Sequence, residues 1–176
     1  MRFFIGIKRV HLFVLSSIMA RKIDLLLQEY GESHQNKLNK AIHWVCIPLI
    51  MYSLVGLLWS IPFPRDFLNG WLSVGSILIF VSLVYYLRLS IPLFIGFLMI
   101  SLGLVMGNYY LFQLLNHDHI QMFWISFIIF FVAWLGQFYG HKLEGKKPSF
   151  LKDLQFLMIG PAWLLHFIYL KVGIPY

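Results

Sequence analysis

The sequence predicts an all-α integral membrane protein, a small bundle of four transmembrane helices followed by a fifth apolar helix that Gly160-Pro161 breaks. Composition is the first reason: 60% of the 176 residues are hydrophobic and 12% are charged, whereas soluble domains carry roughly 25% charged residues. Mean hydropathy is +0.76. The second reason is that the apolar residues form uncharged segments near the roughly 20 residues that a spanning helix needs. A soluble domain of this length could not bury so much apolar surface, so the excess must face lipid.

Four uncharged segments are long enough to span a bilayer, and they cover residues 41–60, 70–87, 91–115 and 122–140. The turn at 61–66 contains two prolines, which remove backbone donors and fix φ. The connections at 88–92 and 116–119 are equally short, so two tight helical hairpins are expected. A fifth uncharged segment, 154–170, contains Gly160-Pro161 and is expected to form a short, bent or interfacial pair of helices.

Basic residues beside the apolar segments predict the orientation in the bilayer. Four lie in 21–40, one is Arg88 and four lie in 141–153, which makes nine on one side, whereas Arg65 stands alone on the other. The amino-terminal region and the 141–153 segment are therefore expected in the cytoplasm, at an inner membrane in a bacterium or at the endoplasmic reticulum in a eukaryote. This bias also accounts for the net charge of +7 without a nucleic-acid partner.

Residues 1–20 are expected to be an N-terminal extension or a weak anchor, and residues 21–176 a single multi-span membrane domain. The first segment resembles a weak signal peptide, but its apolar core is short and is interrupted by His11 and two serines. The single cysteine, Cys46, excludes an intrachain disulfide and any multi-cysteine zinc or iron–sulfur site.

Histidines are the main candidates for chemistry, because ionisable groups at membrane depth or at its edge are functional candidates. There are seven in the chain. His34 and His43 precede or begin the first predicted span, and His141 ends the fourth. The predicted topology brings all three to the same membrane face, so their convergence is expected from topology rather than from spacing.

Local spacing adds detail around His141. Gln137, His141 and Glu144 fall at i, i+4 and i+7, which places them on one stripe of a helix. A histidine and a carboxylate one turn apart make half of a metal site, and the glutamine can orient a ligand or a water. Two or three histidines with one carboxylate suit a non-haem Fe(II) centre with positions open to dioxygen and substrate, although zinc accepts the same donors.

The first site requires a break in the chain. Asn39 and His43 are four residues apart and share a helix face. His34 lies nine residues before His43, which is about 900° of continuous helix and puts it on the opposite face. Both histidines reach one centre only if a loop separates them, and a loop leading into a helix capped near Asn36 or Asn39 is expected.

Two motifs carry a family resemblance. The first reads Tyr30-x3-His34-x4-Asn39-x3-His43-x4-Pro48, and the second reads Gln137-Phe138-x-Gly140-His141, followed by Glu144, Lys146-Lys147-Pro148 and Gly160-Pro161. Together they resemble the membrane-bound 2-hydroxy fatty acid dioxygenases, the enzymes of fatty-acid α-oxidation. The resemblance covers roughly residues 28–172.

The resemblance implies an Fe(II)-dependent reaction with O2 that converts a 2-hydroxy fatty acid to the fatty acid one carbon shorter, without 2-oxoglutarate. It also implies a site on the cytoplasmic side and a connection to sphingolipid-related lipid metabolism. The residues that match the family's motif positions are His34, His43 and His141, expected to be catalytic and metal-binding, and Asn39 and Gln137, expected to be cofactor-binding. Glu144 is the candidate carboxylate ligand from the local spacing, and it departs from the family pattern, in which the acidic residue falls one position later.

Two other functions fit the same residues. A non-enzymatic lipid-binding or scaffold membrane protein would use its histidines as interfacial hydrogen-bond donors. A bis-histidine haem membrane protein needs two histidines facing each other across the bundle at similar depth, which His43 and His166 approach. The diiron desaturase and hydroxylase class is disfavoured, because its clustered HxxxH and HxxHH boxes are absent from the sequence.

Overall fold

The computed structural model describes residues 21–32, 34–63, 71–145 and 150–175, with only the backbone of residues 150–157. Within these ranges the regular structure is helical and contains no strand, which confirms the all-α prediction. The predicted extension or anchor at 1–20 lies outside the described residues. The helices are α2 (Lys22–Glu32), α3 (Lys37–Trp59), α4 (Val74–Leu89), α5 (Ile91–Leu114), α6 (His119–Glu144) and α7 (Phe150–Val172).

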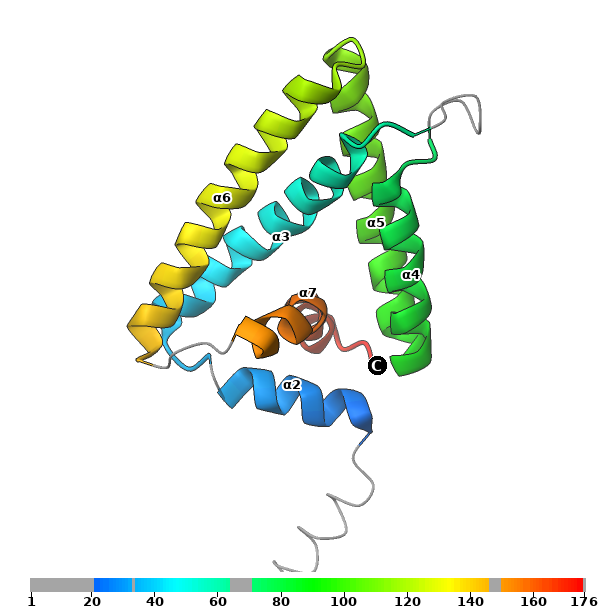
Figure 1. Cartoon of the computed structure of the whole chain (residues 1–176). Helices are drawn as coiled ribbons and strands as arrows, with labels where there is room; N and C mark the ends of the chain where they lie inside the picture. Colours follow the sequence, from blue (N-terminus) through cyan, green and yellow to red (C-terminus); the bar gives the residue numbers. More distant parts are fainter. Residues whose placement is uncertain (1–20, 33, 64–70, 146–149, 176) are drawn as a thin grey trace, which may run out of the picture.

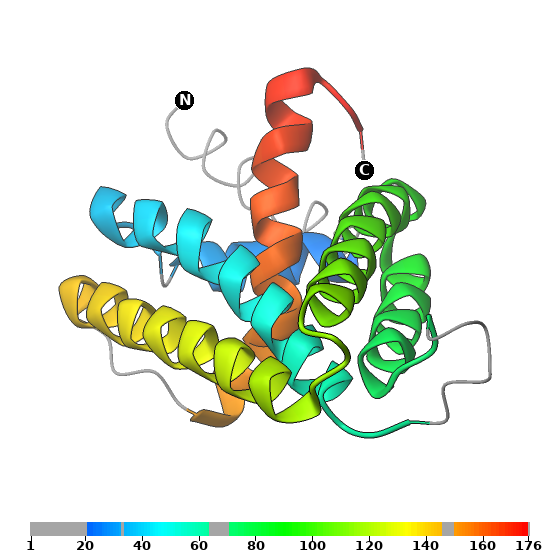
Figure 2. The same ribbon diagram turned by 90° about the horizontal axis from the view of Figure 1, so that it is seen from above.

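The helices form a wedge with two arms (Figure 1). Antiparallel α3 and α6 lie side by side along one arm, and antiparallel α4 and α5 form the other. Helices α2 and α7 lie at the open end, and the view from above shows α7 passing between the arms (Figure 2). Because α7 contacts α2, α3 and α5, it holds the open end together.

Three helices, α3, α5 and α6, are long and apolar enough to cross a membrane, which supports the prediction of a membrane protein. The second predicted span, at 70–87, forms α4 with 16 residues, fewer than the roughly 20 that a crossing needs. A capping box explains where α4 begins. Ser73 accepts a hydrogen bond from the Ser76 backbone at 3.1 Å, and Ser76 accepts one from the Ser73 backbone at 2.8 Å.

One of the two predicted hairpins forms as expected. Ser90 alone joins α4 to α5, and its extended backbone ends one helix and begins the next. The connection from α5 to α6 is also short, with positive φ at Asn116 and His117. However, α5 and α6 diverge from this turn, and α6 packs along α3 instead. The principal partner of α3 is therefore a helix far away in sequence.

Helix α7 corrects the expectation of a broken pair of helices at 154–170. The helix runs continuously through Gly160-Pro161, although Pro161 cannot donate to the carbonyl four residues earlier. Tertiary packing explains the difference, because Pro161 is buried. A Cβ at Gly160 would lie 3.1 Å from both the Tyr30 hydroxyl and Ile47 Cδ1. Close contact with α2 and α3 thus stabilises a turn that the local sequence disfavours.

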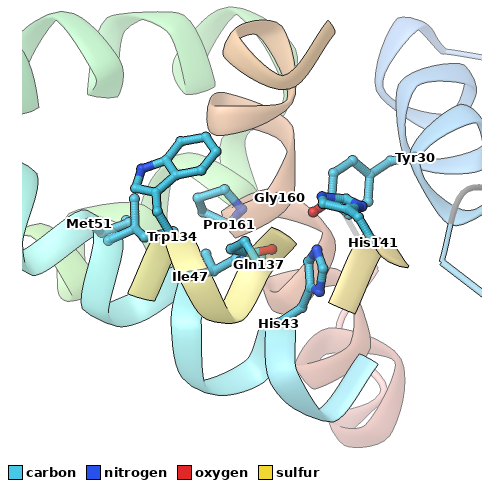
Figure 3. Close-up of a pocket in the computed structure, with 10 residues that line it drawn as sticks. Tyr30, His43, Ile47, Met51, Trp134, Gln137, His141, Gly160 and Pro161 are labelled. Carbon is cyan, nitrogen blue, oxygen red and sulfur yellow. The ribbon is translucent and has the colours of Figure 1, made fainter. Parts of the chain in front are cut away.

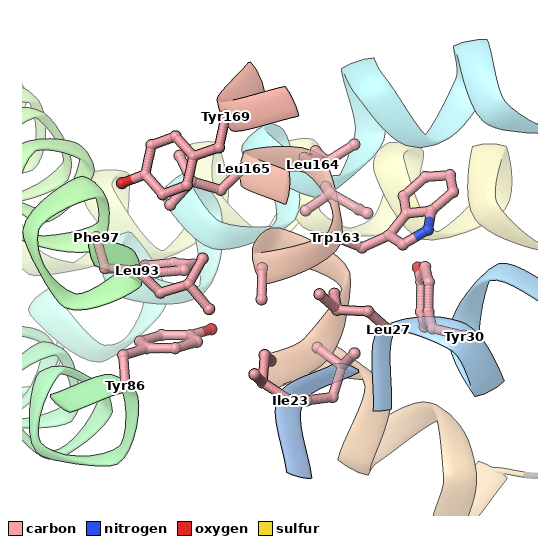
Figure 4. Close-up of a cluster of buried hydrophobic side chains, with 13 residues drawn as sticks. Ile23, Leu27, Tyr30, Tyr86, Leu93, Phe97, Trp163, Leu164, Leu165 and Tyr169 are labelled. Carbon is pink, nitrogen blue, oxygen red and sulfur yellow. The ribbon is translucent and has the colours of Figure 1, made fainter. Parts of the chain in front are cut away.

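The largest buried cluster lies where α2, α4, α5 and α7 meet (Figure 4). The rings of Tyr86 and Phe97 stack with centroids 3.5 Å apart. Tyr86 donates its hydroxyl to the Met158 carbonyl at 2.5 Å, and Tyr169 donates to the Pro92 carbonyl at 2.6 Å. These bonds satisfy the polar ends of buried aromatic side chains. The cluster fixes α7 and α2 against the second arm, and thereby positions Tyr30 beside the start of α3.

Candidate metal centre

Three histidines from three segments meet at the open end of the wedge. His34 precedes α3, His43 lies within α3 and His141 lies near the end of α6. One ring nitrogen from each histidine lies within 4.8 Å of the others. The ring centroids are 4.4 Å apart for His34 and His43, and 5.2 Å apart for His43 and His141. The structure therefore brings together residues that are about 100 positions apart in the sequence.

The chain break that His34 and His43 require is present between α2 and α3. The Asn36 side chain caps α3 by accepting hydrogen bonds from the backbone of Leu38 at 2.8 Å and of Asn39 at 3.2 Å. Because α3 begins only after this cap, His34 is not part of the helix and is not held on the helix face opposite His43. It turns back over the first turns of α3 and reaches His43.

Backbone carbonyls determine which ring nitrogen of each buried histidine carries the proton. His34 Nδ1–H donates to the Tyr30 carbonyl at 2.6 Å, and His43 Nδ1–H donates to the Asn39 carbonyl at 2.9 Å. Histidines that bind metals almost always donate their second ring nitrogen in this way. Both Nε2 atoms are then left with lone pairs, and these atoms are 2.9 Å apart. Two lone pairs at this distance repel each other, and a cation beside them would relieve the repulsion.

Burial keeps this pair in the form that binds metals. His34 and His43 are each 1% exposed. Burial lowers the pKa of His34 from 6.5 to about 4, so its ring is neutral near pH 7. Neutral imidazole is the form of histidine that binds metal ions. The donor set therefore fits a divalent transition metal.

An aromatic wall that the site prediction did not include supports His34. The Tyr30 ring stacks on the His34 ring with centroids 4.0 Å apart and an interplanar angle of 13°. The centroid of the Trp163 ring lies 5.4 Å from the His34 ring centroid and 5.3 Å from the Tyr30 ring centroid. Tyr30 could have been found from its place in the first motif. Trp163 comes from α7, and the only local signal is the neighbouring Gly160-Pro161.

Glu144 lies outside the three-histidine cluster and contacts the start of α3. Its carboxylate accepts hydrogen bonds from the backbone N–H of Gln35 at 2.6 Å and of Asn36 at 3.0 Å. It also accepts one from Asn39 Nδ2 at 2.9 Å. A carboxylate at a helix N-terminus is favourable because the unpaired N–H groups there carry partial positive charge. These bonds join the end of α6 to the loop that carries His34.

Asn39 and Gln137 lie next to the histidines in different ways. Asn39 is fully buried and connects Glu144 to His43, through its side chain and its backbone carbonyl respectively. Its Oδ1 atom has no hydrogen-bond partner among the described residues. A Cβ at Gly140 would collide with that oxygen, so glycine permits the close approach of α6 to α3. Gln137 is 6% exposed and lines the pocket beside His43 and His141.

The pocket next to the histidines has a polar and an apolar end (Figure 3). Its cavity volume is about 50 Å³. His43, His141 and Gln137 provide the polar end. The remaining wall is mostly apolar and consists of Tyr30, Ile47, Ile50, Met51, Trp134, Gly160 and Pro161. This shape suits a ligand with a polar head and an apolar body.

Comparison with known families agrees with this geometry. A family model described as "Mpo1-like: 2-hydroxy-palmitic acid dioxygenase Mpo1-like" matches residues 20–172. The matched range includes the three histidines and every residue that lines their pocket. Comparisons with curated proteins and with solved structures gave no match.

Proposed function

Because the chain belongs to the Mpo1-like family of 2-hydroxy-palmitic acid dioxygenases, we propose that it is a membrane-bound, Fe(II)-dependent dioxygenase. Its substrate would be a 2-hydroxy fatty acid, and its product the fatty acid one carbon shorter. The observation that carries the proposal is the cluster of three histidines, in which two buried Nε2 lone pairs face each other at 2.9 Å.

His34, His43 and His141 would hold the metal. Three protein ligands leave coordination positions open for a substrate and for dioxygen, as in other non-haem iron oxygenases. Bound Fe(II) would supply the activation of dioxygen and a Lewis-acidic position for the substrate's carboxylate and 2-hydroxyl groups. Zinc accepts the same nitrogen donors, so the choice of iron depends on the dioxygenase family and on the experiment below.

The reaction balances with dioxygen as the sole oxidant. The C1–C2 bond breaks, C1 leaves as CO2, and C2 becomes the carboxyl carbon of the shortened acid. Of the five oxygen atoms in the substrate head and O2, two remain in the new carboxyl, two leave in CO2 and one leaves in water. The substrate loses four electrons and O2 accepts four, so 2-oxoglutarate is not required.

The surrounding residues would position the reacting groups. The carbonyls of Tyr30 and Asn39 orient the His34 and His43 rings through the Nδ1–H bonds. Glu144 would hold the loop that carries His34 rather than act as a ligand, because its oxygens already accept hydrogen bonds from that loop. Gln137 would donate its amide N–H to the substrate carboxylate at the polar end of the pocket.

The orientation belongs to the same proposal. Four basic residues of segment 21–40, at or just before the start of α2 and in the first turns of α3, lie at the end of the bundle where the histidines meet. The positive-inside rule would place this end on the cytoplasmic side. A 2-hydroxy fatty acid in that leaflet could then present its carboxyl end to the metal while its acyl chain stays in an apolar environment.

Metal-dependent turnover tests the proposal. The protein would be purified in detergent, stripped of metal, loaded anaerobically with Fe(II) or Zn(II), and then given O2 and 2-hydroxypalmitate. We expect pentadecanoic acid by mass spectrometry from the iron-loaded protein alone. His141→Ala should lose both iron and product. His119→Ala is the matched control, because His119 lies at the opposite end of α6 and its ring donates to the Ser60 carbonyl.

Three results would contradict the proposal. Iron binding without product from any 2-hydroxy acid would remove the assigned reaction. Absence of metal binding under all loading conditions would favour the non-enzymatic lipid-binding alternative. A Soret band that disappears in His166→Ala would favour the bis-histidine haem alternative. The structure speaks against that alternative, because His43 Nε2 faces His34 Nε2 at 2.9 Å rather than an open space for haem.

A further inference from the structure

A second cavity adjoins the histidine pocket. It has a volume of about 120 Å³ and lies among α3, α4, α5 and α7. Met51 and Pro161 line both cavities, so the two meet at these side chains. A space of about 15 Å³ already accepts a water molecule, so each cavity is larger than a packing void. The two adjoining cavities follow one another from the histidines into the wedge.

The side chains that line the second cavity present a mostly apolar surface. Most of its lining is aliphatic or aromatic, from residues such as Leu54, Val55 and Phe97. Two of its hydroxyl groups already donate within the protein: Ser82 to the Leu78 carbonyl at 2.9 Å, and Tyr86 to the Met158 carbonyl at 2.5 Å. Water gains few hydrogen bonds in such a space, whereas an acyl chain loses its unfavourable exposure to water.

A single stripe of α3 connects the two cavities. His43, Ile47 and Met51 are spaced by four residues and lie on one helix face. Ile47 and Met51 line the histidine pocket, and Met51 and Val55 line the second cavity. From His43 the helix rises roughly 12 Å to Met51 and roughly 18 Å to Val55. A chain whose carboxyl end lies at the histidines would therefore follow this stripe into the second cavity.

We propose that the acyl chain of the 2-hydroxy acid occupies the second cavity, and that Met51, at the junction, sets the chain length the protein accepts. The proposal rests on the function proposed above and assigns a place to the apolar part of the same substrate. Met51 is half-buried, and the unbranched methionine side chain can move aside more easily than a branched or aromatic one. Long chains pass this side chain, and short chains end before it.

Substitution at the junction tests the assignment. Met51→Trp should block the path, so the ratio of turnover on 2-hydroxypalmitate to turnover on 2-hydroxydecanoate should fall about tenfold or more relative to wild type, since pocket discrimination of this size follows from a few methylene groups. Leu49→Trp is the matched control, because Leu49 lies two residues away on the same helix and is 41% exposed. That control should leave the ratio unchanged.

A second variant tests the far end of the path. Ser101 is buried on α5 and lines the second cavity but not the histidine pocket. Ser101→Phe should reduce turnover of the longest acids while it leaves 2-hydroxydecanoate unaffected. This variant keeps the proposal testable if Met51→Trp does not fold. An unchanged chain-length profile in whichever of the two variants folds would overturn the proposal.

Photo-crosslinking gives a readout that needs neither metal nor turnover. The probe is 2-hydroxypalmitate with a diazirine at its tenth carbon, added to the metal-free protein in detergent. We expect labelling of cavity residues such as Leu78 and Leu104. Labelling confined to exposed residues such as Phe80 and Leu102 would overturn the proposal.

The two proposals can fail separately. Cavity labelling without turnover under any metal would remove the dioxygenase function and support the acyl site. Iron-dependent turnover, with an unchanged chain-length profile and labelling outside the cavity, would support the function and overturn the acyl site.

Discussion

Histidines lie at both ends of the bundle, and they differ in what their ring nitrogens can reach. At the open end, carbonyls occupy the Nδ1 atoms of His34 and His43, and the Nε2 atoms converge with His141. At the far end, His119 Nδ1–H donates to the Ser60 carbonyl at 2.9 Å, and the rings of His117 and His119 pack against Phe112. The difference is that a third segment, the end of α6, adds His141 to the pair at the open end and completes a group of three histidines that could hold a metal ion.

Removal of a clustered histidine should have the largest effect. His43→Ala and His141→Ala should each lower iron affinity and turnover by more than about 100-fold. Loss of a residue that only supports a metal ligand costs up to about 100-fold, and loss of a ligand itself should cost more. His119→Ala should retain both, because His119 lies at the opposite end. Iron content per protein and turnover of 2-hydroxypalmitate measure the effect. An equal loss in all three variants would remove the contrast between the two ends.

The two ends of the bundle also have carboxylates at helix N-termini. Glu144 accepts hydrogen bonds from the loop before α3, and Asp118 accepts them from Ile120 and Gln121 in α6. Glu144→Gln should weaken iron binding about 10-fold to 100-fold, since it loosens the loop that carries His34. Asp118→Asn should not change it. Competition with a chelator measures the affinity.

A different outcome would assign Glu144 to the metal. If Glu144→Gln abolished iron binding as completely as His141→Ala, the carboxylate would be a ligand in the iron-loaded protein. X-ray absorption of the loaded wild type and variant would then show the loss of one oxygen neighbour.

Close helix contact at the histidine end should appear as a stability difference between two glycines. Gly140→Ala places a Cβ against Asn39 Oδ1 and should destabilise the protein by about 1–3 kcal/mol, the usual cost of overpacking. Gly103→Ala meets no atom within 4 Å and should be neutral or stabilising by up to about 1 kcal/mol, because alanine favours helix. Thermal unfolding in detergent compares them. Equal melting temperatures would contradict the tight contact.

The smallest expected effect is a pH dependence at the far end. Hydrogen bonds from the backbone of Gln121 and Ile120 lower the pKa of Asp118 below its usual value. A carboxyl with a lowered pKa in the folded state stabilises the protein at pH above its unfolded pKa, and this contribution disappears as pH falls through the folded value. Thermal stability of wild type should therefore decline at acidic pH more than that of Asp118→Asn. Parallel declines would contradict this role.

Much of the site could be predicted because its members have local signals. The i, i+4 relation puts Asn39 and His43 on one face, and the cap at Asn36 supplies the break that His34 needs. The basic flanks predicted that the three histidines lie at one end of the bundle, and the structure brings them together there. Neither spacing nor charge indicated that Glu144 would contact the Gln35 and Asn36 backbone, because that contact joins residues more than 100 positions apart.

A helical chain that is apolar enough for a membrane could be predicted from the residues alone, because segment length and charge are properties of neighbouring residues. The motifs that resemble the family are likewise local patterns of residues. Three features became visible only in the folded chain: α6 pairs with α3, α7 continues through Gly160-Pro161, and two cavities meet at Met51. Each of these depends on contacts between distant helices, where packing energy outweighs local preference and the spaces left between side chains define what can bind.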